Sequence, residues 1–266
     1  MRRRRGRAVL ARGLWTAGEL AVTLGVVVLL FCVHQLWWTN RQARADARHE
    51  VAVLERQWEN EPAESAPTPG ATPSRASDSS DGTQGDGDRT PGVGDGGGSQ
   101  SPRRDQAYAV LRIPRIGLTV PIAEGTSRAA VLNKGYVGHY PHTAQPGQAG
   151  NVALAGHRNT HGEPFRRLDE MRPGDTVRVD TADARYTYAV ERTLPRTSPA
   201  DGTVIAPVPY SSAHPRYRYT EPGYYLTLTT CTPEFTSRYR LVVWARLKTA
   251  EPRTAAGSEH AVGGAD

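Results

Sequence analysis

The thiol of Cys231 is the group in this sequence best suited to covalent chemistry. The other cysteine, Cys32, lies in an apolar segment near the amino terminus, so Cys231 has no disulfide partner in the polar region that follows. Cys231 ends an expected strand, and Thr232-Pro233 then turns the chain into a loop. A thiol at the end of a strand is open to solvent, which favours a nucleophile over the alternative, a buried small hydrophobe.

A cysteine nucleophile needs a proton acceptor, because a thiol with a pKa of about 8.5 is mostly protonated at neutral pH. His157 directly follows the apolar run Val152–Gly156, an expected buried strand, and so also lies at a strand end. The sequence therefore predicts His157 as the partner of Cys231. The other histidines of this region lie in loops rich in Pro and Gly, as surface residues do: His139, His142, His161 and His214.

Acyl transfer also needs a group that stabilises the developing oxyanion. Arg240 opens the last expected strand, and a hairpin between this strand and the one ending at Cys231 would bring the two residues together. Arg238 has the same strand parity but lies farther into the loop. Alternation alone does not separate the two arginines, so Arg240 is the first candidate and Arg238 the alternative.

The elements that must position these residues are mostly strands. Short runs with period-two alternation or continuous apolar character are punctuated by Pro and Gly, a pattern typical of a β-barrel or sandwich. One short helix is expected over residues 164–171, ended by Pro173-Gly174. The expected strands cover residues 108–114, 118–122, 151–156, 175–180, 185–191, 224–230 and 240–247.

The composition indicates a folded domain with appended segments. Only 38% of the 266 residues are hydrophobic, and the chain has 27 Gly and 20 Pro. Residues 61–106 contain no aromatic residue, no Leu or Ile and a single Val, which predicts a disordered linker. Such a linker spans roughly 35–40 Å and would let the domain work at a distance from its anchor. The folded domain is expected over residues 107–250, followed by a disordered tail over 251–266.

The first sixty residues predict a membrane anchor. Residues 2–12 carry six Arg and no acid, and an apolar stretch runs over 14–38 with Trp15, Trp37 and Trp38 at its ends. About 20 such residues cross a bilayer. The alternative is a cleaved signal peptide, but its apolar region would be shorter and followed by small residues. We expect a basic cytoplasmic segment over 1–13, one transmembrane helix over 14–38, a polar stalk of helical pattern over 39–60, and an extracellular domain.

Three segments together resemble the signature of the sortase family: residues 155–162 (AGHRNTHG), residues 226–233 (LTLTTCTP) and the start of the strand at Arg240. With the motif Gly138-His-Tyr-Pro141, the chain is similar to class E sortases of actinobacteria over residues 108–247. The resemblance implies an all-β fold, a closed eight-stranded barrel with short helices, preceded by one transmembrane helix and a disordered linker. Residues 131–139 are less rich in Pro than the family pattern.

The resemblance also implies an enzyme, a cysteine transpeptidase with the catalytic triad His157, Cys231 and Arg240. The Cys231 thiolate, beside a His157 imidazolium, would cleave a C-terminal sorting motif (Leu-Ala-x-Thr-Gly or Leu-Pro-x-Thr-Gly) between Thr and Gly. An amine of a peptidoglycan precursor, similar to lipid II, would then accept the acyl group. Thr230 and Tyr140 would bind the substrate. No cofactor, metal or nucleic acid is implied, although the net charge is +6; the partners are secreted proteins with sorting signals, the precursor and the membrane.

Other cysteine enzymes fit the pattern less well. In papain-like peptidases the cysteine precedes the histidine and opens a helix, whereas here His157 comes first. An L,D-transpeptidase would carry its histidine and cysteine within one short motif, which this sequence lacks. A protein without enzymatic activity remains the alternative: an anchored β-barrel that binds cell-wall material, with Cys231 buried and inert.

Overall fold

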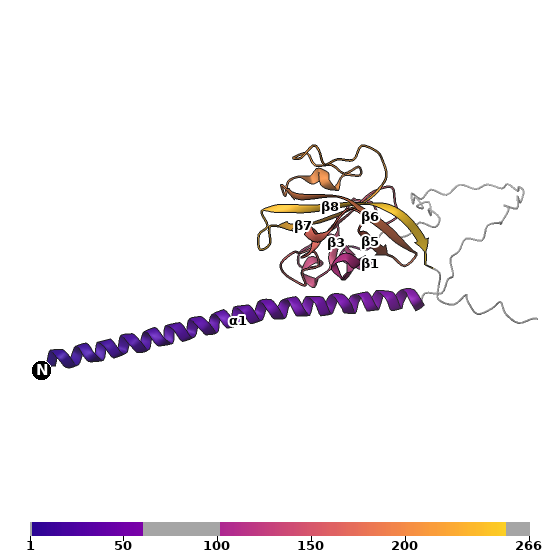
Figure 1. The fold of residues 1–266 in the computed structure, drawn as a ribbon. Coiled ribbons are helices and arrows are strands. Elements are labelled where there is room, and N and C mark those ends of the chain that lie inside the picture. The colour runs from indigo at the N-terminus through magenta and orange to yellow at the C-terminus, as the bar shows by residue number, and fades with distance from the viewer. Residues whose placement is uncertain (1, 61–101, 254–266) are drawn as a thin grey trace, which may run out of the picture.

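The computed structural model describes residues 2–60 and 102–253. One long helix, α1 (Arg2–Asn60), precedes eight strands that close into a barrel (Figure 1). Residues 61–101 of the linker expected over 61–106, and residues 254–266 of the tail expected over 251–266, lie outside the described residues; Glu251 and Pro252 belong to the last strand. The strands are β1 (Ala107–Ile113), β2 (Leu118–Glu124), β3 (Val137–His139), β4 (Gly150–Ala155), β5 (Thr176–Asp180), β6 (Ala184–Thr197), β7 (Tyr224–Thr232) and β8 (Tyr239–Pro252).

The barrel closes in the order β1-β2-β3-β4-β7-β8-β6-β5, with β5 pairing back to β1. The β2–β3 and β4–β7 pairs are parallel, and the remaining pairs are antiparallel. A closed barrel has no free sheet edge, which removes the unpaired backbone groups that an open sheet exposes. The expected closed eight-stranded barrel is confirmed.

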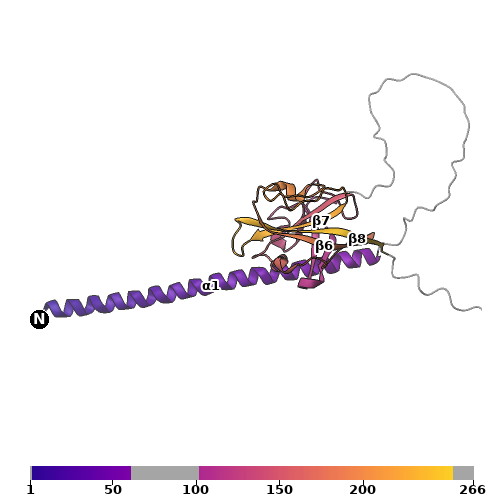
Figure 2. The same cartoon turned by 45° about the horizontal axis from the view of Figure 1, so that its top comes forward.

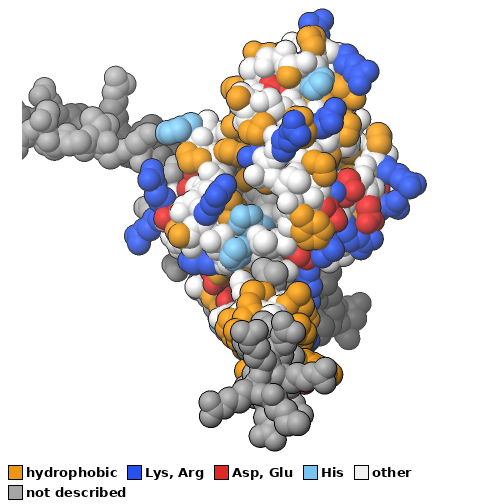
Figure 3. Space-filling view, turned by 90° about the vertical axis from the view of Figure 1, so that its left-hand side faces the viewer, with side chains coloured by type: hydrophobic (Ala, Val, Ile, Leu, Met, Phe, Trp, Pro, Cys, Tyr) orange, Lys and Arg blue, Asp and Glu red, His pale blue; other side chains and the backbone are white. Residues whose placement is uncertain are grey.

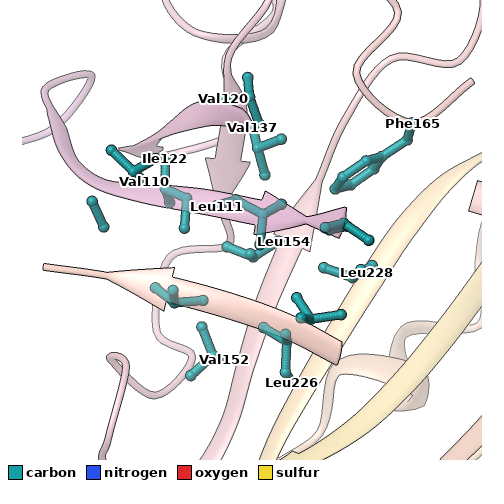
Figure 4. Packing of buried hydrophobic residues seen from close by; sticks show 14 of the residues in the cluster. Val110, Leu111, Val120, Ile122, Val137, Val152, Leu154, Phe165, Leu226 and Leu228 are labelled. Carbon is teal, nitrogen blue, oxygen red and sulfur yellow. The ribbon is translucent and has the colours of Figure 1, made fainter. Parts of the chain in front are cut away.

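The barrel interior is filled by aliphatic side chains from the strands that the sequence pattern indicated. β4 is buried at Asn151 to Leu154 and β7 at Tyr225 to Thr230. Figure 4 shows Val152 and Leu154 facing Leu226 and Leu228. The parallel β4–β7 pair is therefore buried on both of its faces, as parallel strands usually are.

Two local expectations differ from the structure. The helix expected over residues 164–171 is reduced to turns and a 3-10 helix at Leu168–Glu170. Its segment is anchored by Phe165, which is fully buried and whose ring would meet a Cβ added at Gly156. β3 was not expected, because three residues give no alternation. It is held by its neighbours, with Gly138 paired to both Ala123 and Ala155.

The long connection between β6 and β7 folds over the outside of the barrel. Its apolar residues pack with Trp244, whose indole nitrogen donates to the Val204 carbonyl oxygen at 3.0 Å. The buried carboxylate of Asp201 accepts hydrogen bonds from four hydroxyl groups, those of Thr197, Thr203, Ser211 and Ser212. These bonds hold the pKa of Asp201 down to about 2, although burial opposes them.

Helix α1 continues past its apolar segment without a break and packs against the barrel (Figures 1 and 2). No proline occurs before Pro62, which permits one continuous helix up to Asn60. Four side chains on one stripe are buried against the barrel: Ala43, Ala47, Val51 and Leu54. The linker predicts a domain that works at a distance from its anchor, whereas in the structure α1 itself packs against the barrel.

Candidate active site

The parallel pairing of β4 and β7 brings His157 and Cys231 to the same end of the barrel. Ala155 and Thr229 are partners in the register, and the Gly156 N–H donates to the Thr229 carbonyl oxygen at 3.2 Å. His157 and Cys231 each lie two residues beyond this pair. Because the strands run in the same direction, the two residues lie at the same, carboxyl-terminal end of this strand pair.

The antiparallel pairing of β7 and β8 sets Arg240 opposite Cys231. The two are direct partners in the register, so their side chains lie on the same face. The Arg240 guanidinium donates from Nη1 to the carbonyl oxygens of Ser237 and Tyr239, at 3.0 and 3.1 Å. Arg238 precedes β8, is exposed, and stacks its guanidinium 5.4 Å from the centre of the Tyr239 ring.

His157 is half-buried, and its protonation is set by what surrounds it. Burial, then His161 and then Arg128 lower its pKa from 6.5 to about 4. Its Nε2 is 3.0 Å from Asn133 Oδ1, an acceptor, so the neutral ring carries its hydrogen on Nε2 and leaves Nδ1 unprotonated. This pKa favours a neutral imidazole at rest, in contrast to the imidazolium expected from the resemblance.

Arg158 joins the two strand ends and had no role in the sequence interpretation. Its side chain is buried, and Nη1 lies 3.2 Å from the Thr232 hydroxyl and 3.5 Å from the Cys231 carbonyl oxygen. Nη2 pairs with Asp169 at 3.1 Å. A buried guanidinium beside the histidine must have partners, and the strand end carrying Cys231 supplies them. Only the position of Arg158 next to His157 in the motif could have indicated this.

The two residues expected to bind substrate make hydrogen bonds inside the protein. The buried Thr230 hydroxyl donates to the Gly156 carbonyl oxygen at 2.8 Å. The Thr229 hydroxyl donates to the Leu154 carbonyl oxygen, so Tyr140 is the donor in its 3.1 Å bond to Thr229. Both bonds tie β7 to β4 and its flanking loop close to the site.

The sequence profile of the sortase domain family matches residues 111–248. The chain belongs to the sortase family. Sortase SrtE1 of Streptomyces coelicolor is 41% identical over 257 residues, 95% of this chain and 61% of that protein. Sortase SrtE2 of the same organism is 31% identical over 256 residues, which make up 94% of this chain and 87% of that protein.

Solved structures agree with this assignment. The crystal structure of Streptomyces coelicolor sortase E1, described as having a tripeptide in the active site, matches with a TM-score of 0.54 and 45% identity. The match covers 60% of this chain and 98% of that one. The SrtF sortase of Corynebacterium diphtheriae matches with a TM-score of 0.53 and 26% identity, covering 61% of this chain and 95% of that one.

These similarities confirm the expectation of a sortase with class E relatives. Sortases are cysteine transpeptidases of the cell wall, so the family supports an enzyme and not the alternative of a purely binding barrel. The chain spans 61% of SrtE1, and that protein's own substrates and partners are not carried over by the match. The α1 helix is also long and apolar enough to cross a membrane.

Proposed function

We propose that this sortase cleaves a C-terminal sorting motif of the Leu-Ala-x-Thr-Gly or Leu-Pro-x-Thr-Gly type between Thr and Gly. It then transfers the threonyl acyl group to an amine of a peptidoglycan precursor. The observation that carries the proposal is the equal offset of His157 and Cys231 from one parallel register pair, with Arg240 opposite Cys231. This arrangement supports the proposed roles of Cys231 as nucleophile, His157 as proton carrier and Arg240 as oxyanion donor.

In the first half of the reaction, Cys231 Sγ attacks the threonine carbonyl carbon while its proton passes to His157. The neutral imidazole that the low pKa favours has an unprotonated Nδ1 to accept this proton. The tetrahedral intermediate then collapses as His157 returns the proton to the leaving glycine amine. A thioester between Cys231 and the threonine remains.

In the second half, the acceptor amine attacks the thioester carbonyl and His157 removes a proton from it. Collapse releases Cys231 and leaves a new amide bond, so no net oxidation or hydrolysis occurs. Arg240 stabilises the oxyanion of both intermediates. Within the described residues only its Nη1 is hydrogen-bonded, so Nε and Nη2 remain free to donate to the substrate.

The side of the membrane on which this reaction occurs depends on how α1 is inserted. We propose that α1 crosses the bilayer once, with the arginine-rich amino terminus in the cytoplasm and the barrel outside. In intact cells, a protease added outside should then cut residues 61–106. Protection of the barrel under these conditions would show the inverse orientation.

The proposal is tested with the full chain in detergent micelles. The protein is incubated with Leu-Ala-x-Thr-Gly and Leu-Pro-x-Thr-Gly peptides and a small amine, and the products are identified by mass. We expect the acyl–amine product from the parent chain and neither cleavage nor transfer from Cys231→Ala. Cys32→Ala, which removes the thiol in the apolar segment, is the matched control and should keep full activity. Turnover in Cys231→Ala would contradict the mechanism.

A further inference from the structure

The two ends of the barrel meet different parts of α1. Near Trp38, where the apolar segment ends, Asn40 and Arg44 contact the loop that follows His157. About 30 Å farther along the helix, Trp58 lies under the guanidinium of Arg253, at 4.8 Å from the ring centre. The end of the barrel that carries the site therefore faces the apolar segment, and the opposite end faces away.

The contact at the end near the membrane is dense and polar. The Asn40 side chain donates to Glu163 Oε1 at 2.9 Å and accepts from the Gly162 N–H at 3.2 Å. Arg44 donates to the Gly162 carbonyl oxygen at 3.0 Å and pairs with Glu163 at 2.9 Å. Glu163 is almost fully buried, and its charge is shared between Arg44 of the helix and Arg166 of its own loop, each at 2.9 Å. These bonds fix the position of the loop that follows His157 along the axis of α1.

Close backbone packing reinforces this contact. A Cβ added at Gly135 would lie 2.7 Å from the Ala43 carbonyl oxygen, so the helix and the loop touch through their backbones. Gly135 directly follows the 3-10 helix Leu132–Lys134, which contains Asn133, the hydrogen-bond partner of His157. Small residues on both sides of a contact permit such an approach. Both loops that flank His157 thus rest on α1.

The loop of the β7–β8 hairpin lies at the end of the barrel that faces the apolar segment of α1. In both ribbon views this loop extends toward the amino-terminal end of α1 (Figures 1 and 2). Figure 3, viewed from that side, shows histidine side chains near the centre of this face with basic side chains around them. At the hairpin, Phe235 is 77% exposed in a loop whose residues 233–238 are all exposed. An exposed phenyl ring beside a membrane segment is suited to the lipid interface.

We propose that residues 40–58 of α1 hold the barrel as a fixed unit with its catalytic end against the bilayer, and that the loop bearing Phe235 enters the lipid interface. Asn40 lies two residues beyond Trp38, about 3 Å along the helix axis. The His157 loop is thereby held at the level of the membrane surface. The inference rests on the proposed membrane span of α1, but not on its orientation or on the chemistry of the site.

Depth measurements on the full chain in phosphatidylcholine–phosphatidylglycerol nanodiscs test the proposal. In a background of Cys32→Ser and Cys231→Ala, a spin label is attached at Thr236→Cys, beside Phe235, or at Ala182→Cys. Ala182 is exposed in the β5–β6 turn; in that turn the Asp183 carbonyl oxygen accepts from Arg253, at the end near Trp58. We expect the label at 236 to collide with oxygen more than with a water-soluble nickel complex, and the label at 182 to show the reverse. Equal water exposure at both positions would overturn the proposal.

A matched pair of helix variants tests the docking itself. Ala47 is buried against the barrel, whereas Ala45 is exposed on the same helix. Ala47→Glu should release the barrel and give the label at 236 the water exposure of position 182, while Ala45→Glu should change nothing. An unchanged depth in Ala47→Glu would overturn the docking. None of these depth measurements depends on turnover. A failure of the proposed transpeptidase function would therefore be detected separately, in the peptide assay.

Discussion

The Thr230 hydroxyl donates a 2.8 Å hydrogen bond to the carbonyl oxygen of Gly156, the residue before His157. Thr230 also directly precedes Cys231, so this bond, together with that from the Gly156 N–H to the Thr229 carbonyl oxygen, holds together the backbones that carry the proposed nucleophile and proton carrier. Both residues are buried, and an unpaired carbonyl there would be costly.

Replacing Thr230 separates this positioning role from the substrate-binding role that the sequence suggested. Thr230→Val keeps the shape but leaves the Gly156 carbonyl unpaired, which should destabilise the fold by about 1–3 kcal/mol. It should also lower kcat with little change in KM, because the two groups lose their alignment. Thr230→Ser should restore both. A rise in KM at unchanged kcat for Thr230→Val would instead favour direct substrate binding.

Arg158 should behave as a second positioning residue. Arg158→Met removes the bonds to the Cys231 carbonyl and the Thr232 hydroxyl and leaves Asp169 without its partner. We expect a lower unfolding temperature and a fall in kcat, and Arg158→Lys should not restore them, because an ammonium cannot span the three groups. Arg167→Met is the control, since Arg167 is exposed and pairs only with Glu170 among the described residues. Equal effects of the two changes would contradict this role.

The strand ends could be predicted from the sequence, whereas the residues that support them could not. Apolar runs closed by Gly156 or by Thr232-Pro233 already placed His157 and Cys231 at the ends of strands. Asn133 and Arg158 act through contacts between segments far apart in the chain, which local pattern does not encode. The register sets Arg240 opposite Cys231, whereas Arg238 lies before β8; strand parity alone does not separate the two, and the choice between them stays a prediction.

The packing of α1 against the barrel could not be predicted from the sequence for a similar reason. Its buried stripe begins with Ala43 and Ala47, and small residues give little hydrophobic contrast with the polar residues around them. Ala43 contributes through its close approach to Gly135, which only the folded barrel provides. The segment over residues 39–60 therefore reads as a polar stalk, although it is an interface.

The low pKa of His157 predicts a specific pH dependence of stability. Between about pH 6.5 and pH 4 the unfolded chain binds a proton at this histidine and the folded chain does not, so stability falls as the pH is lowered through this window. His157→Gln, which cannot titrate, should unfold at temperatures that depend less on pH across the same window. Thermal unfolding of the full chain in detergent at several pH values measures this, and identical slopes for the two proteins would contradict the lowered pKa.

The neighbours of His157 should shift its titration in a fixed order. His161 contributes more than Arg128 to lowering the pKa, after burial. His161→Gln should therefore raise the pKa of His157 more than Arg128→Gln does, and each should move the acid limb of kcat/KM to higher pH. Histidine NMR signals followed through a titration measure the pKa directly. A larger shift in Arg128→Gln would contradict the electrostatics of the site.

The choice between Arg240 and Arg238 gives the sharpest kinetic prediction. Arg240 is held in β8 opposite Cys231, whereas Arg238 lies in the exposed hairpin loop. Removing one preorganised oxyanion donor lowers kcat by about 10²–10³. Arg240→Ala should lose a factor of this size, and Arg240→Lys should stay severely impaired because an ammonium lacks the planar fork of donors. Arg238→Ala should act mainly on KM. With folding checked by circular dichroism, a larger loss of kcat in Arg238→Ala than in Arg240→Ala would reverse the assignment.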